Sequence, residues 1–256
     1  MKRFTGSIVA IAGIAVLVSL AGVPAAGQAR ALPRTADGKP DFSGIWEVLS
    51  KANYNIEPHS ASRGVPAGAG VVEGGMLPYQ PAALEKRRQN YANRRTADTE
   101  AKCFLPGVPR VMYFEHPFQI VQAPSQVTML FEYLHATRNV FMNTPHPKAG
   151  LDFWMGDSRG TWDGDTLVVD ANNFNAETWF DRAGNHHSDA LHIVERYTLT
   201  DADHIAYNAT IDDGKVFTRP WKMNLVFYRH TEPSFRLLDY ECYGFGLDEL
   251  PIVPTK

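Results

Sequence analysis

The stretch ALHIVERYTLTDADHIAYNATIDD, residues 190–213, decides the fold class of this chain. Apolar side chains recur at every second position over 205–211, with Asn208 and Thr210 between them. A period of two is typical of a β-strand that buries one face. The polar residues 201–204 separate this strand from an apolar run before it, as a turn would. The stretch therefore predicts two strands joined as a hairpin.

The same pattern continues on both sides of this hairpin. GTWDGDTLVVD (160–170) places Asp-Gly between two strand-like runs, which is the strongest short-range signal for a hairpin. QVTMLFEYL (126–134) and VFTRPWKMNLVFYR (216–229) also carry apolar side chains at near-regular second positions. Eight or so sequential strands without intervening helices predict an antiparallel meander. A meander of this length usually closes to remove its edges, so we expect an all-β, up-and-down barrel.

The N-terminus has the pattern of an export signal. Lys2 and Arg3 precede the apolar run SIVAIAGIAVLVSLAGV (7–23), and the small residues PAAGQA (24–29) follow it. This order predicts a signal peptide over 1–29 rather than a retained membrane anchor. We therefore expect a periplasmic or secreted mature protein without a membrane span.

Residues 30–102 are expected to form an irregular segment with one helix. TADGKPDFSGIWEV (35–48) leads through turns into one short strand, and 55–80 is rich in Gly, Ala, Pro and Ser. PAALEKRRQNYANRR (81–95) begins with Pro at a plausible first helical position and contains good helix formers. The β-barrel domain then covers 103–256.

Charge argues against a nucleic-acid partner. The net charge of the 256-residue chain is −3, and its one basic cluster joins Lys86, Arg87 and Arg88 with Arg94 and Arg95. We interpret this cluster as the solvated face of the predicted helix, because its residues alternate with polar ones. Phosphate loops, dinucleotide fingerprints and Gly-x-Ser-x-Gly elbows are absent from the sequence, which disfavours nucleotide enzymes and common serine hydrolases.

The two cysteines of the chain predict a disulfide. Cys103 and Cys242 are the only pair, and export places them in an oxidising compartment. Two free buried thiols are the alternative interpretation. A catalytic thiol is disfavoured because neither cysteine has a histidine close to it in sequence.

Two resemblances support the barrel. Gly44-Ile45-Trp46 opens the first strand as the Gly-x-Trp of lipocalin-like (calycin) barrels does. The chain is also similar to a poorly characterised family of exported soil-bacterial proteins. The motifs that carry this similarity are CFLPGVPR (103–110), QIVQAPSQVTMLFEY (119–133), PHP (145–147), WMGDSRGTWDGDTLVVDANNFN (154–175), TWFDRAGNHHSDALHIVERY (178–197) and TIDDGKVFTRPW (210–221). The resemblance implies fold and export rather than a chemistry, and Asn172-Asn173 departs from the aliphatic-Gly pair that is usual in the family.

The connection 171–188 is the candidate site. It is the longest connection in the β region, and it combines aromatic side chains with titratable ones. Its members that could contact a ligand are Phe174, Asn175, Trp179, Phe180, Asp181, His186, His187 and Ser188. Aromatic walls with a few polar groups are typical of a small-molecule site, and such sites collect at the mouth of a barrel.

Acid–base catalysis is one role for this connection. His187 would be the general base or acid, with Asp181 as the carboxylate that orients its ring. His192 and His146 would be the second acid or substrate contacts, although the pattern of 190–198 leaves open whether His192 faces inward.

The substrate would lie against residues outside and inside the connection. Tyr133, Phe174 and Trp179 would form the wall of the pocket, and Asn175 would contact the substrate. Arg138 could clamp a carboxylate, although a surface ion pair with Glu132 is the commoner arrangement.

A metal site is the second possibility. Zinc could be bound by His146, His192 and either His187 or His186, together with Asp181 or Glu195, although no compact pair of histidines supports it. No organic cofactor is predicted.

We therefore expect an exported lyase, isomerase or hydrolase that acts on an apolar or aromatic small molecule. The alternative is a non-catalytic, lipocalin-like carrier of a hydrophobic ligand.

Overall fold

The computed structural model describes residues 31–148 and 150–242. The predicted signal peptide at 1–29 lies outside this part of the chain. Within it, no helix has both the length and the apolar character that crossing a membrane requires.

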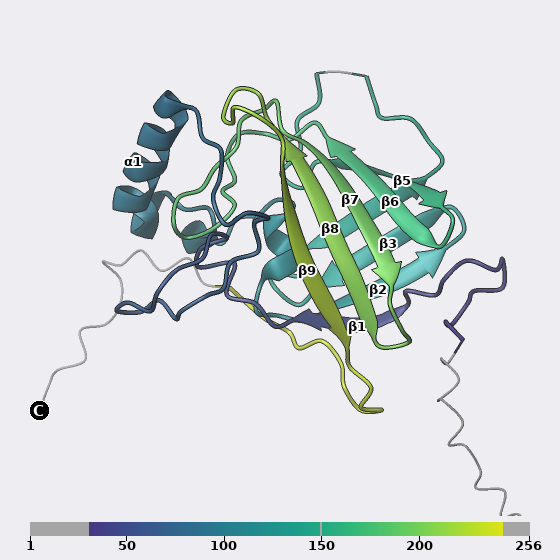
Figure 1. Cartoon of the computed structure of the whole chain (residues 1–256). Coiled ribbons are helices and arrows are strands. Elements are labelled where there is room, and N and C mark those ends of the chain that lie inside the picture. The colour runs from purple at the N-terminus through teal and green to yellow at the C-terminus, as the bar shows by residue number, and fades with distance from the viewer. Residues whose placement is uncertain (1–30, 149, 243–256) are drawn as a thin grey trace, which may run out of the picture. The chain divides into compact units, whose positions relative to one another are not determined.

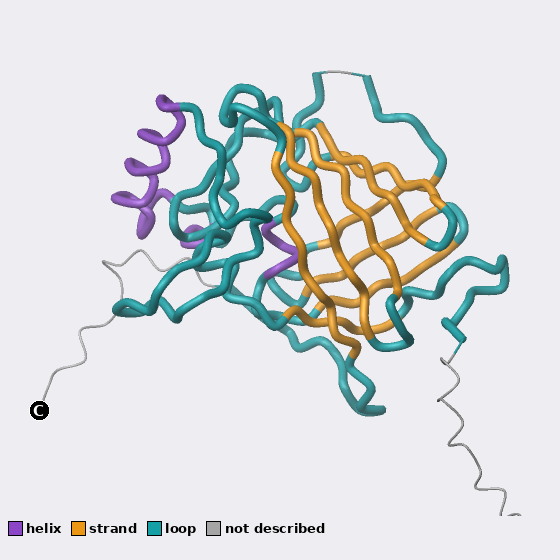
Figure 2. The backbone as a smooth tube through the Cα atoms, in the orientation of Figure 1, coloured by secondary structure: helices purple, strands orange, loops and turns teal. Residues whose placement is uncertain are grey.

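Nine strands form one closed barrel (Figures 1 and 2). Each strand pairs with the next along the chain, and the last pairs with the first. The strands are β1 (Gly44–Val48), β2 (Phe118–Ala123), β3 (Gln126–Phe131), β4 (Thr137–Met142), β5 (Asp157–Asp163), β6 (Thr166–Asn172), β7 (His192–Leu199), β8 (His204–Asp212) and β9 (Trp221–Arg229). The predicted all-β barrel is confirmed, and its closed form is compatible with a calycin-like fold.

One strand pair makes the barrel mixed rather than wholly antiparallel. β4 and β5 run parallel, with Val140 opposite Ser158, while the other eight neighbouring pairs within the described residues are antiparallel. Parallel neighbours cannot be joined by a tight turn, because the chain must first return to the end where it began. The long connection 143–156 makes this return.

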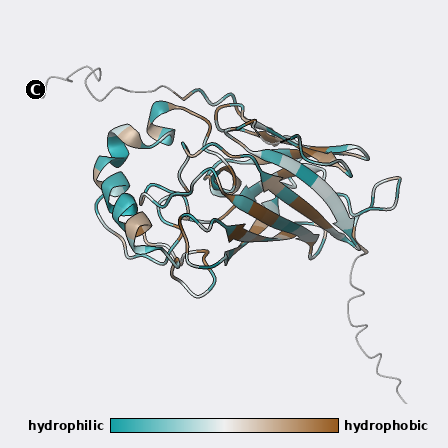
Figure 3. Ribbon diagram, turned by 90° about the horizontal axis from the view of Figure 1, so that it is seen from above, coloured by the Kyte–Doolittle hydropathy of each residue, from teal (hydrophilic) through white to brown (hydrophobic). Residues whose placement is uncertain are grey.

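The buried face of the strands is the one that the sequence predicts. Ile205, Tyr207, Ala209 and Ile211 of β8 are all buried, and the residues between them face outward to varying degrees. Figure 3 shows this alternation as brown and teal bands along the strands. Burying a large apolar side chain contributes about 1.5–3 kcal/mol, so one such face per strand accounts for a stable core.

β1 comes from the segment 30–102, and one aromatic–cation contact ties it to β9. Trp46 is fully buried, and its indole N–H donates to the Phe42 carbonyl at 2.9 Å. The Arg229 guanidinium lies 4.2 Å from the centre of the Trp46 ring and donates to the Ser43 carbonyl. This cluster packs at the β1–β9 seam, where the pairing of the two strands closes the barrel.

The predicted helix is confirmed as α1 (Pro81–Ala97), with Pro81 in its first turn. Most of α1 is polar (Figure 3), and it docks through a narrow contact. Gly184 adopts a φ of +83°, and a Cβ placed there would lie 2.7 Å from the Arg87 carbonyl oxygen and the Tyr91 amide nitrogen. The buried Asn90 amide donates to the Gly184 carbonyl at 3.2 Å. Only glycine permits this approach between helix and loop.

The predicted disulfide between Cys103 and Cys242 is present, with 5.6 Å between the Cα atoms and a sequence separation of 139. It links the chain that follows the short helix η1 (Glu100–Lys102) to the tail beyond β9. Disulfides persist in oxidising compartments, so this bond agrees with the predicted export.

Candidate functional site

Much of the connection 171–188 is buried, and Asp181 bonds it to the N-terminal segment. The Asp181 carboxylate is fully buried and accepts from the backbone N–H groups of Ile56 (2.8 Å), Ala183 (2.9 Å) and Asn185 (3.1 Å). The Asn185 side-chain amide adds a fourth donor at 2.6 Å. Burial raises the pKa of Asp181 to about 6, although the four donors favour the ionised form. These bonds join two distant segments of chain.

His187 is also buried and bonded within the connection. Its Nδ1 lies 2.9 Å from the Ser188 carbonyl oxygen, so Nδ1 carries the proton and donates it. Nε2 then accepts from the Thr178 hydroxyl at 2.7 Å. Burial lowers the pKa of His187, which favours this neutral ring. The hydrogen bonds of Asp181 and His187 lead to other groups and do not join the predicted dyad.

His146 and His192 come together on the outer face of the barrel. His192 Nε2 lies 2.9 Å from one Asp170 oxygen, and His146 Nε2 lies 2.8 Å from the other. His146 Nδ1 lies 2.5 Å from Asp157, so both nitrogens of this ring face carboxylates. Because Glu195 on β7 points into the barrel, His192, three residues earlier, points out. The two rings therefore do not lie beneath His187.

The ligands proposed for zinc do not assemble. Over residues 31–148 and 150–242, no group of three or more His, Cys, Asp or Glu side chains has the arrangement of a metal site. His187 lies in the buried connection, whereas His146 and His192 are bonded to Asp170 on the outer face. The donor set therefore does not fit a zinc ion.

Arg138 fills the barrel interior instead of reaching the surface. Its Nη1 donates to Glu195 at 2.9 Å and to the Tyr197 hydroxyl at 3.2 Å, and its Nη2 makes a second contact to Glu195. Tyr207 also donates to Glu195 (2.8 Å), and Ser158 accepts from the other edge of the guanidinium (3.0 Å). Every charge here is paired, which buried ions require. Arg138 therefore forms no surface ion pair with Glu132, and its paired, buried guanidinium is not placed to clamp the carboxylate of a ligand.

The other predicted contact residues are mostly core. Phe174 is fully buried, and its ring occupies the space that a Cβ on Gly156 would need. Trp179 is 7% exposed, and Asn175 accepts from the Glu177 amide at 3.2 Å in a local turn. Among the substrate contacts that we predicted from sequence, Tyr133 alone lines the cavity described next.

A cleft of about 1370 Å³ lies outside the barrel, between α1 and the segment 54–65. We call it the α1 cleft. Arginines and tyrosines dominate its charged and aromatic lining, which comprises Arg63, Arg87, Arg88, Arg94, Arg95 and Arg182 with Tyr54, Tyr91, Tyr133 and Tyr240. The volume exceeds the 300–1,000 Å³ that is typical of small-molecule sites, so a ligand would occupy part of it.

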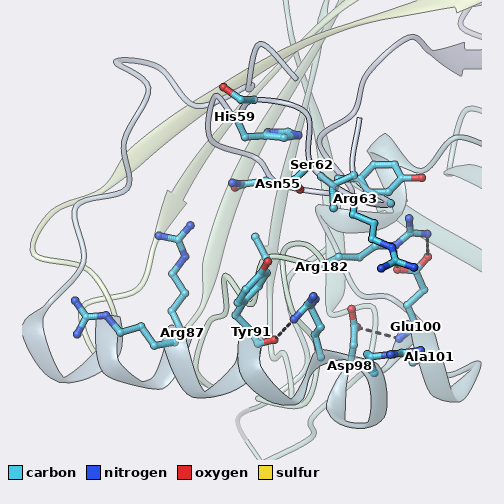
Figure 4. Close-up of a pocket in the computed structure, with 18 of the residues that line it drawn as sticks. Asn55, His59, Ser62, Arg63, Arg87, Tyr91, Asp98, Glu100, Ala101 and Arg182 are labelled. Carbon is cyan, nitrogen blue, oxygen red and sulfur yellow. Dashed lines mark hydrogen bonds and ion pairs between the residues drawn. The ribbon is translucent and has the colours of Figure 1, made fainter. Parts of the chain in front are cut away.

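The two long walls of the α1 cleft are built differently. On one side Arg87 and Tyr91 rise from α1 (Figure 4). On the other, the segment predicted to be irregular forms a small hairpin, in which His59 and Gly68 exchange two backbone hydrogen bonds of 2.9 and 3.0 Å. Ser62 and Val65 exchange two more at 2.9 Å, and these close the tip of the hairpin.

A neutralised ion cluster forms one end of the α1 cleft. Arg110 is buried and donates to Asp98 (2.7 and 3.0 Å) and to Glu100 (2.6 Å). Arg182 donates to the other side of Glu100 at 2.5 Å (Figure 4). Burial alone would raise the pKa of Glu100, but the two guanidinium groups hold it below its usual range. Two positive charges and two negative charges therefore balance at this end.

Tyrosine rings in the α1 cleft pack against cations and against one another. The Arg94 guanidinium lies 4.0 Å from the Tyr91 ring centre, and that of Arg182 lies 4.5 Å from Tyr54. Tyr133 and Tyr240 stack with their centres 5.6 Å apart, next to the disulfide. The cleft lining therefore places aromatic rings directly beside positive charge.

The sequence contained a signal for this site that we interpreted as structural. The basic cluster of the predicted helix comprises Lys86 and four arginines, and the arginines line the α1 cleft: Arg87, Arg88, Arg94 and Arg95. The opposite wall lies more than twenty residues earlier in the chain. Sequence spacing on the helix alone could not indicate it.

Comparisons with known proteins add no assignment. No protein-family model matches the chain, and no curated protein matches it. The similarity to an exported soil-bacterial family therefore stays a prediction from the motifs.

Proposed function

We propose that this protein is an exported carrier that binds a small aromatic molecule in the α1 cleft, with the barrel as a rigid scaffold. The observation that carries the proposal is the cleft itself. It has the volume for a ligand and four tyrosines in its lining, at a place where a helix, a hairpin and the C-terminal tail meet.

The barrel interior offers less support for a ligand. Inward side chains pack against one another there: Phe118 and Phe227 lie 5.2 Å apart between ring centres, and Tyr197 and Tyr207 lie 5.1 Å apart. The buried ion pair of Arg138 occupies part of the same space. A lipocalin-like carrier of the usual kind would hold its ligand inside the barrel, so the proposed site differs from that arrangement.

Of the two functions predicted from sequence, a carrier fits the geometry better than an acid–base enzyme. The nitrogens of His187 and the oxygens of Asp181 are committed to buried partners, and neither residue lines the α1 cleft. A general base needs hydrogen-bond reach to a substrate proton. Binding in the cleft requires only its shape, its rings and its charges.

Fluorescence titration with N-phenyl-1-naphthylamine, a neutral aromatic dye, tests the proposal. We expect saturable binding at one site to the mature protein. Ala101→Trp places a bulky ring in the lining of the α1 cleft and should abolish binding. Ala92→Trp is the matched control, because Ala92 is an exposed helical residue outside the lining.

Equal binding by the wild type and both variants would place the dye elsewhere and overturn the proposal. Far-ultraviolet circular dichroism and a urea unfolding curve of each variant ensure that a loss of binding does not reflect a loss of fold.

A further inference from the structure

The arginines of the α1 cleft are only partly neutralised. Arg87 pairs with Glu57 at 2.7 Å, Arg88 with Glu85 at 3.1 Å, and Arg182 with Glu100. Within the described part of the chain, the other three arginines of the lining, Arg63, Arg94 and Arg95, form no ion pair with a carboxylate. The acidic groups of the lining, Asp98 and Glu100, are already bonded to Arg110. The cleft thus carries an excess of positive charge, although the chain as a whole is negative.

The backbone holds Arg63 in a defined position. Arg63 and Gly64 are the two central residues of the turn that the reciprocal Ser62–Val65 bonds close. Gly64 has a φ of +74°, which suits a tight two-residue turn. Figure 4 shows Arg63 at this tip, on the side of the cleft opposite α1. A flexible loop would give a cation no fixed place, whereas this turn presents it to the cleft.

We infer that the ligand of the α1 cleft is an aromatic oxyanion, whose anionic group binds Arg63 and Arg95 and whose ring packs against the cleft tyrosines. This inference rests on the proposed function, and it adds the charge of the ligand. Guanidinium groups match carboxylate, sulfonate and phosphate oxygens through paired N–H donors. The charge excess would attract such an anion, and its binding would relieve the repulsion among the three cations.

A pair of dyes with one aromatic frame tests the inference. 8-Anilino-1-naphthalenesulfonate carries a sulfonate that the neutral N-phenyl-1-naphthylamine lacks. We expect the sulfonate to bind the wild type about tenfold more tightly, which corresponds to about 1.4 kcal/mol and is ordinary for one charge-assisted contact. Added salt should reduce this advantage, because exposed charges are screened.

The variant Arg63→Gln/Arg95→Gln should weaken binding of the sulfonate about tenfold and so bring its affinity close to that of the neutral dye. The control Arg219→Gln/Lys222→Gln removes the same charge from exposed positions outside the cleft, and it should leave both affinities unchanged. Urea unfolding midpoints of both double variants check that the fold is intact.

The outcomes separate the inference from the proposed function. Suppose that both dyes bind the wild type equally, are lost in Ala101→Trp and keep their affinity in Arg63→Gln/Arg95→Gln. The inference is then wrong, and the carrier proposal survives. If both double variants weaken the sulfonate equally, the effect is one of net charge, and the inference is again wrong. If Ala101→Trp affects neither dye, both ideas fail.

Discussion

Asn173 adopts a backbone conformation that residues with a side chain rarely adopt. It has a φ of +56°, in the left-handed region, directly after the last residue of β6. Glycine would adopt this region without a Cβ penalty. Asn tolerates the same region better than other residues with side chains do.

Substitutions at Asn173 test this account. Asn173→Ala should lower the free energy of unfolding by about 1 kcal/mol, since an alanine gains nothing that offsets left-handed strain. Asn173→Gly should leave it unchanged or raise it slightly. Urea unfolding of the three proteins measures both effects. Equal stability of the two variants would mean that strain at this φ is not what limits the position.

Asp181 predicts a pH dependence of stability. Its folded pKa of about 6 lies above the ordinary value of 3.8, so its protonated form is favoured in the folded state. The contribution of Asp181 to the free energy of unfolding is fully present below about pH 3.8 and is lost as the pH rises through 6. This loss is at most about 3 kcal/mol. Burial lowers the pKa of His186 to about 4 and also lowers the pKa of His187. The stability that these two histidines contribute is therefore lost in the opposite direction, as the pH falls.

The measurement must therefore isolate Asp181. We expect the unfolding free energy of the wild type minus that of Asp181→Asn to decrease between pH 4 and pH 6.5. The histidines cancel in this difference. A difference that stays constant, or that rises with pH, would show that the four N–H donors outweigh burial.

At the scale of elements, α1 depends on tertiary contact for its position. Few of its side chains are buried, Ala83 and Asn90 among them, so a hydrophobic stripe does not seat it. A helix of this kind is held by particular contacts rather than by an apolar face. The close approach at Gly184 is such a contact, and it also sets one wall of the α1 cleft.

Gly184→Ala should displace α1. The substitution adds left-handed strain and a contact of 2.7 Å with the helix backbone, so we expect a loss of about 2–3 kcal/mol in unfolding free energy together with weaker dye binding. Gly74→Ala is the matched control, because Gly74 has a φ of +80° but no atom within 4 Å of the added Cβ. The control should lose only about 1 kcal/mol in unfolding free energy, and it should bind the dye as the wild type does. Equal effects of the two substitutions would contradict the docking that we describe.

At the scale of the whole molecule, the disulfide joins segments that no strand pairing connects. Tyr240 lies two residues before Cys242 and packs on Tyr133, while the Leu238 amide donates to Glu132 at 2.8 Å. The disulfide thus keeps the tail after β9 beside the barrel and at one end of the α1 cleft. A sequence separation of 139 gives such a cross-link a large effect on the unfolded chain.

Removing the disulfide should cost stability without changing the barrel. For Cys103→Ser/Cys242→Ser we expect a loss of about 3–5 kcal/mol, because the unfolded chain regains the entropy that the cross-link removes. Urea unfolding in the absence of reductant measures this loss. Adding reductant should bring the wild type close to the variant and leave the variant unchanged. A wild type as unstable as the variant without reductant would mean that the bond contributes nothing.

The sequence by itself determined the barrel, the helix and the disulfide pair. Period-two alternation, as in 205–211, fixes which side chains a strand buries, because successive residues of a strand face opposite sides. Pro81 and the helix formers after it set the start of α1 in the same local way. With only two cysteines in the chain, an intramolecular disulfide has one possible pairing.

Only the tertiary structure decided where the candidate site lies. Asp181 and His187 are close in sequence, but the donors that engage Asp181 include the Ile56 amide, 125 residues away. The walls of the α1 cleft likewise come from a hairpin tip and a helix with no shared sequence pattern. The physical reason is that local periodicity reports which face is buried, whereas a site depends on which distant segments share the space beside that face.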